Sequence, residues 1–328
     1  MHALSHDFWV YDLGAELGPH AISMSELVAN HGPVRPGFED RTGFTTLFTA
    51  GKESALELAT KLLRPILQTL TESLSISTVI FVGSSSEFRT PGNASLLQQE
   101  LNLKKEILTL DINDACTGFI KSLYVASRII ENSHTPNVLL VIADTYRKYF
   151  EESNMKVSPL FSDAASAFLI SKLRIPELRN RVTERNWAIE GVSFMSDGGK
   201  SDTLKITSSE IGNDELFMDG AEVFKFVLGN LGSVVEKASA DAQEIQRHDV
   251  EWVVHQGSRA VVNAVESILG KPEDSLFKSA QYGNTVGSSL PIQLKEISPF
   301  DEKTIGLLAF GVGLSMGCLF VRQGSLPE

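Results

Sequence analysis

The sequence predicts an α/β fold, and three observations support this prediction. Strand-like apolar runs and helix-like amphipathic segments alternate along the chain. The order of these segments in the first half recurs in the second half. The composition, 42% hydrophobic and 21% charged over 328 residues, is that of an ordinary globular protein, and the length corresponds to roughly two average domains.

In the first half, short runs rich in Val, Ile and Leu are separated by longer segments with apolar residues three and four positions apart. The short runs predict buried strands, and the longer segments predict helices. The expected strands are residues 8–13, 78–82, 107–112, 138–142 and 165–171. The expected helices are residues 52–73, 93–101 and 117–131. Along the last of these helices, one face carries Phe119, Leu123, Ala126 and Ile130.

The second half shows the same two patterns. The expected strands are residues 187–194, 250–255, 276–280, 304–310 and 314–322. The expected helices are residues 221–243, 259–269 and 288–297. Each half closes with a strand rich in Gly, Ala and Ser, at residues 162–170 and 311–319.

The two halves repeat one order of motifs. Val79-Ile-Phe-Val-Gly-Ser-Ser is followed by a helix and then by a strand that leads to Cys116. Trp252-Val-Val-His-Gln-Gly-Ser is followed by a helix and then by a strand that leads to Asn284. We therefore expect two pseudo-symmetric halves, although α/β proteins often mimic duplication. The polar stretch 172–185 contains Pro176 and predicts the boundary, with halves at residues 1–175 and 176–328.

Charge and composition exclude several classes of function. The net charge of −12 argues against binding to nucleic acid or to anionic lipid. No apolar run is long enough to span a bilayer and the N-terminus lacks the pattern of a signal peptide, so we expect a cytoplasmic protein. The two cysteines, Cys116 and Cys318, have no neighbours at zinc-ligand spacing, so we expect no disulfide and no metal. The glycine-rich stretch 311–317 lacks dinucleotide-loop spacing, so we expect no nucleotide cofactor there.

Cys116 is the strongest candidate for a catalytic residue. It lies in Asp114-Ala-Cys-Thr-Gly-Phe, between a predicted strand and a predicted helix. Helix N–H groups and the positive end of the helix dipole favour the thiolate at such a turn, so we expect a reactive nucleophile. The alternative interpretation is a small buried apolar side chain.

Two further residues follow predicted strands of the second half. His255 lies at the carboxyl end of a strand, where α/β sheets usually present ligand-binding residues. Asn284 lies in a loop before a helix. Each alone has an ordinary explanation, since most histidines are structural and Asn after Gly is common in turns.

Together these blocks resemble the β-ketoacyl-acyl carrier protein synthase III family, condensing enzymes of the thiolase superfamily. The resemblance rests on the Cys116 motif, on His255-Gln-Gly-Ser and on Tyr282-Gly-Asn-Thr-Val-Gly-Ser-Ser-Leu-Pro. Weaker matches are Arg41-Thr-Gly, Phe161-Ser-Asp-Ala-Ala, Glu222-Val-Phe-Lys and Ala309-Phe-Gly-Val-Gly-Leu-Ser-Met-Gly. The resemblance implies a thiolase-like fold, in which each half is a mixed five-stranded sheet and the helices complete an αβαβα arrangement.

The resemblance also implies a role for each matching residue. Cys116 would accept an acyl group, and backbone N–H groups of Cys116 and Val312 would form the oxyanion hole. His255 and Asn284 would donate hydrogen bonds to the thioester carbonyl of a malonyl-type extender. The residues expected to bind substrate or carrier are Arg41, Phe224, Lys225 and Arg259.

Several positions depart from the family pattern. Gly37 stands where the family has a tryptophan that stacks on coenzyme A, and Met155 stands where it has an arginine. This departure favours an acyl carrier protein over coenzyme A as the donor. Because the carrier is acidic, its dock is expected to be a local basic patch. The family's basic positions after the histidine are occupied by Ala260, Ser267 and Ile268.

The expected function is therefore that of an acyltransferase, a ketoacyl synthase. It would condense acyl-Cys116 decarboxylatively with a malonyl-type thioester, in fatty-acid or specialised-metabolite biosynthesis. The expected partner is acyl carrier protein, with coenzyme A thioesters possible, no other cofactor, and a homodimer as the assembly. Two alternatives stay open: non-condensing acyl transfer to a hydroxyl or amine, and an idle subunit paired with an active paralogue.

Overall fold

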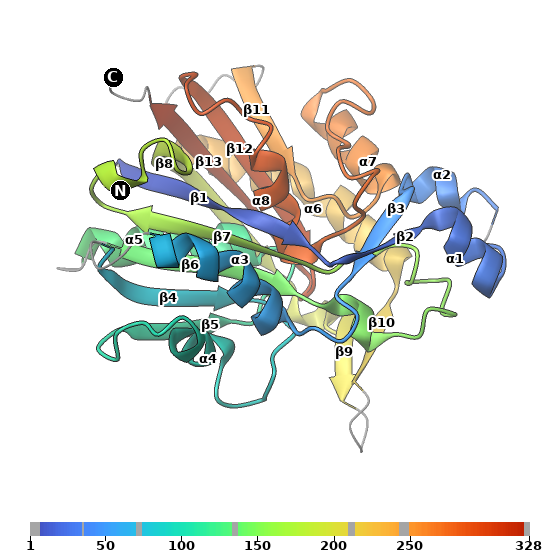
Figure 1. Ribbon diagram of the computed structural model, residues 1–328. Coiled ribbons are helices and arrows are strands. Elements are labelled where there is room, and N and C mark those ends of the chain that lie inside the picture. The colour runs from blue at the N-terminus through green and yellow to red at the C-terminus, as the bar shows by residue number, and fades with distance from the viewer. Residues whose placement is uncertain are drawn as a thin grey trace.

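The computed structural model describes residues 7–34, 36–69, 74–132, 137–208, 214–242 and 249–324. Nine strands form one mixed sheet in the order β11-β12-β13-β8-β1-β7-β6-β4-β5. The first half of the chain supplies β1 (Phe8–Leu17), β4 (Ile76–Val82), β5 (Leu108–Ile112), β6 (Asn137–Asp144) and β7 (Ala164–Ser171). The second half supplies β8 (Thr183–Ser196), β11 (Val250–Val254), β12 (Lys303–Gly311) and β13 (Ser315–Gly324). Antiparallel pairing of β1 with β8 joins the two halves (Figure 1).

The helices lie in three layers. On one outer face, α3 (Ala55–Thr69) and α4 (Asn93–Glu100) cover the first-half strands. On the other, α6 (Gly220–Asp241) covers β8 and β13, and α7 (Arg259–Leu269) packs on α6. Between them, α5 (Gly118–Asn132) contacts strands of both halves, as does α8 (Ser289–Leu294). The αβαβα arrangement expected from the resemblance is confirmed.

Helix α5 shows why the middle layer forms. Phe119, Leu123, Ala126 and Ile130 are all buried, as the predicted apolar face requires. The ring of Phe119 packs on that of Phe168 in β7, with the ring centroids 5.3 Å apart. Burial of a large apolar side chain contributes about 1.5–3 kcal/mol, so this face fixes α5 between the two sheet halves.

The predicted strand at residues 276–280 is wrong, and the second half therefore has four strands in the sheet. Side chains of other elements satisfy this backbone instead of a neighbouring strand. The Glu266 carboxylate accepts the Leu276 N–H at 2.5 Å, and the Gln256 carboxamide accepts the Lys278 N–H at 2.8 Å. Gln256 Nε2 donates to the Leu276 carbonyl at 2.9 Å. With these groups occupied, the segment adds no ladder to the sheet.

Several short elements are additional to the predicted ones. They are β2 (His20–Ser23), α1 (Met24–His31), α2 (Phe38–Thr42), β3 (Thr46–Thr49), β9 (Leu204–Ser208) and β10 (Asp214–Met218). The pairs β2–β3 and β9–β10 form two small antiparallel sheets. Figure 1 shows α1, α2 and α7 grouped at one end of the molecule.

Helix α7 has the predicted bounds, and the other predicted elements are present with changed ends. The ends of two predicted helices, at residues 70–73 and at residue 243, lie outside the described residues. Within the part of the chain that the structure describes, no helix is long and apolar enough to cross a membrane.

Candidate active site

Cys116 lies in the turn between β5 and α5, with 5% of its surface exposed. Gly311, at the end of β12, lies directly against it. A Cβ at Gly311 would come within 2.8 Å of the Cys116 Sγ, so only glycine fits without displacement. The Val312 N–H donates a hydrogen bond toward the thiol. Cys116 and Val312, predicted to act together, are therefore adjacent.

The prediction that the turn favours a thiolate is wrong for the free protein. Burial raises the pKa of the Cys116 thiol, and the carboxyl groups of Asp144 and Asp114 raise it further. The N–H groups of Val312 and Cys116 lower it by less. Because the site is buried and faces acidic groups, desolvation outweighs the helix end. Cys116 is a thiol at neutral pH.

His255 directly follows β11, and its N–H donates to the Leu308 carbonyl at 2.8 Å. Its ring stands edge-on to Phe310, with the centroids 5.3 Å apart. Burial lowers the pKa of His255 to about 3, so the imidazole is neutral at physiological pH. Among the described residues, its Nδ1 has no hydrogen-bond partner. A neutral imidazole carries one N–H and can donate it to a substrate carbonyl.

Asn284 is also buried, with its backbone fixed by a bridge to Phe161. Its Oδ1 accepts the Val286 N–H at 2.9 Å, which orients the amide. Within the described chain, its Nδ2 donates no hydrogen bond. The Nδ2 group is therefore left to donate to a ligand.

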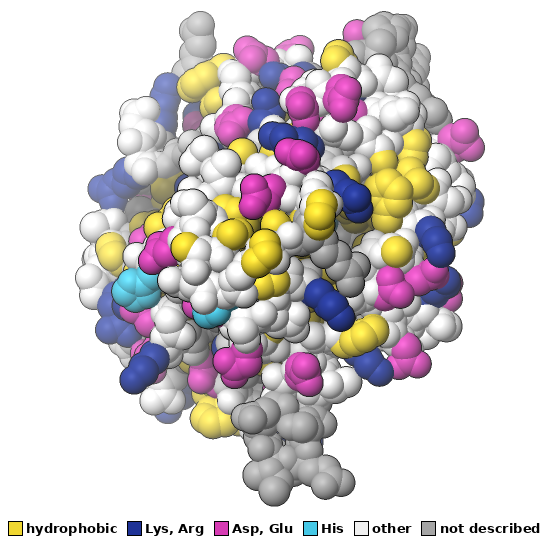
Figure 2. Space-filling model, turned by 90° about the vertical axis from the view of Figure 1, so that its right-hand side faces the viewer, with side chains coloured by type: hydrophobic (Ala, Val, Ile, Leu, Met, Phe, Trp, Pro, Cys, Tyr) yellow, Lys and Arg dark blue, Asp and Glu magenta, His cyan; other side chains and the backbone are white. Residues whose placement is uncertain are grey.

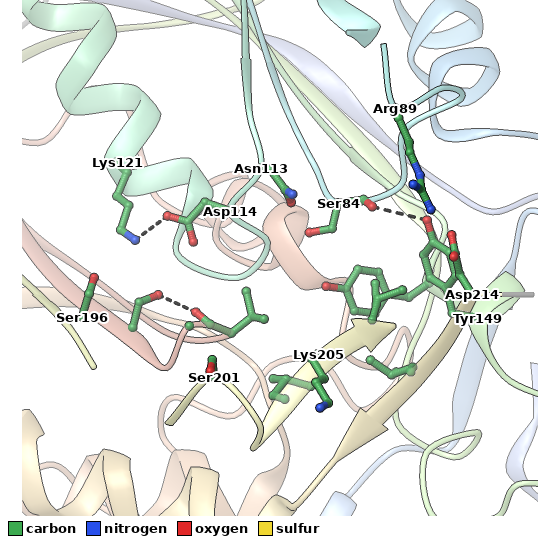
Figure 3. Close-up of a pocket in the computed structure, with 17 residues that line it drawn as sticks. Ser84, Arg89, Asn113, Asp114, Lys121, Tyr149, Ser196, Ser201, Lys205 and Asp214 are labelled. Atoms are coloured by element: carbon green, nitrogen blue, oxygen red, sulfur yellow. Dashed lines mark hydrogen bonds and ion pairs between the residues drawn. The ribbon is translucent and has the colours of Figure 1, made fainter. Parts of the chain in front are cut away.

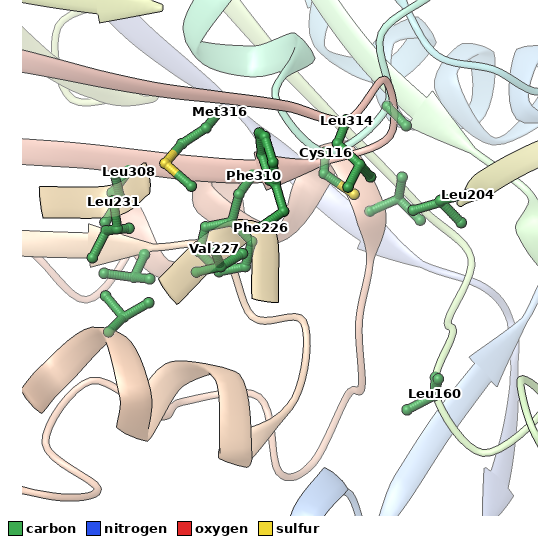
Figure 4. Close-up of a cluster of buried hydrophobic side chains, with 14 of the residues drawn as sticks. Cys116, Leu160, Leu204, Phe226, Val227, Leu231, Leu308, Phe310, Leu314 and Met316 are labelled. Atoms are coloured by element: carbon green, nitrogen blue, oxygen red, sulfur yellow. The ribbon is translucent and has the colours of Figure 1, made fainter. Parts of the chain in front are cut away.

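One strand end and one buried cluster connect the candidate residues. Phe310 contacts His255, and the next residue, Gly311, contacts Cys116. Phe310 and Cys116 belong to the same buried cluster as Val286. Figure 4 shows Cys116 beside Leu314, with Phe310 nearby. Residues of the Cys116 and His255 motifs thus meet at the end of β12, and the Asn284 motif approaches the Cys116 turn at Gly287, where a Cβ would lie 3.0 Å from the Ala115 carbonyl oxygen.

Gln256 fixes His255 relative to the Asn284 loop, a role that the sequence did not reveal. This fully buried side chain joins the end of β11 to the segment before Asn284, through Val254, Leu276 and Lys278. Its own N–H donates to Ser289 Oγ at 2.9 Å. A glutamine directly after a strand-terminal histidine was the only signal for this role.

The predicted substrate-binding residues lie on the helices α2, α6 and α7. Arg41 is exposed on α2, and Phe224 is half-buried on α6. Lys225 is exposed and paired with Glu222 at 2.7 Å. The Arg259 guanidinium lies 5.0 Å from the Phe277 ring centroid and 3.4 Å from Asp274 Oδ1. None of these four residues has a contact with Cys116, His255 or Asn284 in the interactions of the described chain.

The end of the molecule that carries α1, α2 and α7 has a mixed charge pattern. Figure 2 shows Lys and Arg side chains interspersed with Asp and Glu over this face. The expected local basic patch for an acidic carrier is not formed by the described residues on this face.

A cavity of about 610 Å³ lies beside the nucleophile. Val312, Gly313, Tyr146 and Leu204 line it, so it reaches the immediate neighbours of Cys116. Figure 3 shows its wall, which includes the ion pair of Lys121 with Asp114. No group of three or more His, Cys, Asp or Glu side chains suited to a metal ion occurs among the described residues.

Gly311→Ala tests the close approach to the nucleophile. The added Cβ would lie 2.7 Å from the Cys116 Cβ, so the turn or the strand must shift. We expect the free energy of unfolding to fall by about 1–3 kcal/mol, measured by urea titration, and adduct formation at Cys116 to slow by at least about tenfold. Gly229→Ala on α6 is the control, because a Cβ there meets no atom within 4 Å. A Gly311→Ala variant that acylates at the unmodified rate would contradict this geometry.

Asp144 lies at the end of β6, and its raised pKa leads us to expect an unusual dependence of stability on pH. Burial raises its pKa from 3.8 to about 7, although the Ser84 N–H and the Ser85 hydroxyl favour the carboxylate. Its Oδ2 has no partner among the described residues. Between pH 3.8 and about pH 7, Asp144 is protonated in the native state but ionised in the unfolded chain. Stability is therefore lost as pH rises through this window, by roughly 4 kcal/mol in total.

Asp144→Asn should remove that loss. We expect urea unfolding to show the variant more stable than the unmodified chain at pH 8, with the advantage gone at about pH 4. The exposed Asp40→Asn serves as the control. An equal difference at both pH values would mean that Asp144 does not titrate in this window.

The sequence matches one family of known proteins along much of its length. The family model of 3-oxoacyl-[acyl-carrier-protein] synthase III matches residues 110–191, and the model of its C-terminal part matches residues 240–323. The β-ketoacyl-[acyl-carrier-protein] synthase III of Chlamydia caviae is 30% identical over 259 residues, covering 76% of each chain. That of Clostridium perfringens is 28% identical over 300 residues, covering 86% of this chain and 89% of the relative.

Solved structures are similar over nearly the whole chain. The 3-oxoacyl-(acyl carrier protein) synthase III of Pseudomonas aeruginosa gives a TM-score of 0.82 at 23% identity, covering 97% of this chain and 99% of that chain. The priming β-ketosynthase of the R1128 polyketide biosynthetic pathway gives 0.80 at 21% identity, covering 97% of both chains. These similarities confirm the predicted fold.

Proposed function

Because the chain belongs to the 3-oxoacyl-[acyl-carrier-protein] synthase III family, we propose that it is a condensing acyltransferase acting through Cys116. It takes an acyl group from a thioester and condenses it with a malonyl-type thioester to give a β-ketoacyl product. The observation that carries this proposal is the gathering of Cys116, His255 and their neighbours around the end of β12. A nucleophile and carbonyl-binding donors are what the two half-reactions need.

In the first half-reaction, the Cys116 sulfur attacks the carbonyl carbon of the acyl thioester. The N–H groups of Cys116 and Val312 stabilise the oxyanion, and such a donor is typically worth about 3–4 kcal/mol. The bond to the departing sulfur then breaks. Since Cys116 starts as a thiol, its proton must leave during the attack, and the departing thiol takes one up. The product is a thioester on Cys116.

In the second half-reaction, the carbonyl oxygen of the malonyl thioester accepts hydrogen bonds from the His255 N–H and the Asn284 Nδ2. The bond to the carboxylate breaks and releases carbon dioxide, and the electron pair forms an enolate whose oxygen these donors stabilise. The enolate carbon attacks the acyl carbonyl carbon. The bond to the Cys116 sulfur breaks, and the sulfur regains a proton.

Carbon dioxide release tests this function. The full-length protein is incubated with an acyl donor and with malonyl thioester labelled in its free carboxyl group. Condensation releases labelled carbon dioxide in a ratio of one to each product, whereas acyl transfer to a hydroxyl or amine releases none. An acyl adduct without release of labelled carbon dioxide would contradict condensation and favour simple acyl transfer. No adduct from any donor would favour the idle-subunit alternative.

An acyl carrier protein is the proposed donor and acceptor. Gly37 and Met155 support this choice over coenzyme A, because neither side chain can stack on adenine or pair with phosphate.

The proposed assembly is a homodimer that forms through β5. This strand is the outer strand at one end of the nine-stranded sheet, and Leu108 within it is 52% exposed. An exposed strand edge is a template for pairing with another chain. Light scattering at micromolar concentration should give twice the mass of the chain, and a monomer would contradict this assembly.

A further inference from the structure

The cavity beside Cys116 is large for a short acyl group. Its volume of about 610 Å³ falls in the range of pockets that enclose drug-sized ligands, roughly 300–1,000 Å³. An acetyl group would leave most of it empty. The volume therefore fits an extended acyl chain.

Part of the cavity wall is apolar. Tyr146, Leu204 and Leu216 line the cavity and belong with Cys116 to one buried cluster. Figure 4 shows Leu204 close to Cys116. Methylene groups next to the thioester would be buried against these side chains.

The same wall also carries charges, and two of them, Asp114 and Lys121, form an ion pair near Cys116. Its cations are Arg89, Lys121 and Lys205, and its carboxylates are Asp114 and Asp214. The lining thus holds a surplus of positive charge in a chain whose net charge is −12. An alkyl end placed against these groups would remove water from them without replacing its hydrogen bonds, which costs free energy.

Lys205, on β9, is the cation best able to bind a ligand. Lys121 is held by Asp114 in a pair that is mostly buried, and Arg89 also interacts within the chain. Lys205 pairs with Asp202 at 2.7 Å, but the Asp202 side chain is 90% exposed. An exposed pair contributes little to stability, so the flexible lysine can exchange this partner for a buried carboxylate.

We propose that the acyl group loaded on Cys116 ends in a carboxylate, which Lys205 binds in this cavity. The substrate class is thus the monothioester of an extended dicarboxylic acid. This inference rests on the proposed function. The apolar wall holds the methylene chain, and the cationic part of the lining holds its far end.

The experiment compares acylation rates of Cys116 by intact-protein mass spectrometry. The donors are suberoyl, octanoyl and a hydroxyl-ended octanoyl group, each offered on coenzyme A and on acyl carrier protein. The variants are Lys205→Met, Lys205→Arg and, as a control, Lys200→Met. The Lys200→Met substitution removes the same charge at a nearby exposed position. Lys200 pairs with Glu222 at 2.8 Å and does not line the cavity.

We expect the unmodified chain to prefer suberoyl to octanoyl by at least about tenfold. Lys205→Met should abolish this preference, whereas Lys205→Arg and Lys200→Met should keep it. Acylation by octanoyl at an equal or higher rate would overturn the inference while leaving the proposed function intact. Equal rates for the hydroxyl-ended and suberoyl donors, or a Lys205→Met variant that keeps the preference, would also overturn it. No adduct from any donor would overturn the proposed function and this inference together.

Discussion

Cys116→Ala abolishes the acyl adduct that the unmodified chain forms with its donor. The alanine has no nucleophile, and the Val312 N–H beside it then faces no sulfur. We expect intact-protein mass spectrometry to show no added mass, and turnover to fall by at least about a thousandfold. Because the substitution removes only one buried atom, the midpoint of thermal unfolding should change by only a few degrees.

Cys318→Ala is the matched control for this experiment. Cys318 is equally buried but lies in β13, opposite Leu308, and not in the turn before α5. This variant should form the adduct at close to the unmodified rate. An adduct that persists in Cys116→Ala and disappears in Cys318→Ala would place the nucleophile at Cys318 in β13 and refute the proposed site.

His255→Ala separates the two half-reactions. The neutral imidazole is proposed to stabilise enolate charge, which develops only after Cys116 has been acylated. We therefore expect the adduct to form within a few-fold of the unmodified rate, while release of labelled carbon dioxide falls by about a hundred- to a thousandfold. Rapid-quench mass spectrometry follows the first step, and trapping of the label follows the second.

Two further variants and the pH dependence test the role proposed for His255. Asn284→Ala should reproduce it, because its Nδ2 is the second donor, whereas His20→Ala on the exposed strand β2 should alter neither step. Because burial lowers the pKa of His255 to about 3, the rate of carbon dioxide release should show no loss between pH 8 and pH 5 from protonation of this group. If acylation and carbon dioxide release fall equally in His255→Ala, the histidine acts in the first step, and the role proposed here is wrong.

The regular elements of the fold were predictable because their signal is local. The continuous apolar runs of β6 and β7, and the apolar face of α5, report their burial directly. The missed elements are short. β2, for example, has four residues, none of them buried, and it is held by pairing with β3, which begins more than twenty residues later. Pairing of that kind is not encoded in the pattern of either segment.

Two errors arise from tertiary surroundings that the local sequence does not show. The segment at 276–280 has the composition of a strand, but Glu266 and Gln256 occupy its backbone groups. The thiol of Cys116 was expected to ionise readily, but burial and Asp144, contributed by another strand, reverse the direction. The sequence did mark Asp144, as a carboxyl that closes the continuous apolar run of β6.

The candidate residues themselves were predictable from motif order, while their environment was not. Cys116, His255 and Asn284 are each named by a short motif. The cavity beside Cys116 depends on β9, an element that the pattern of alternation did not reveal. In our proposal Lys205, on this short element, selects the substrate, so the reaction was easier to predict than its specificity.

The irregular segment at 276–280 also limits how copies of this protein can associate. A sheet with two open edges can add strands at both and grow without limit, as fibres do. Here β5 offers a regular edge, whereas the last residue of β11 is tied through Gln256 to a backbone that forms no strand. Growth across one edge alone closes after a single two-fold pairing. For the homodimer that we propose through β5, the failure of one strand to form therefore favours a finite assembly.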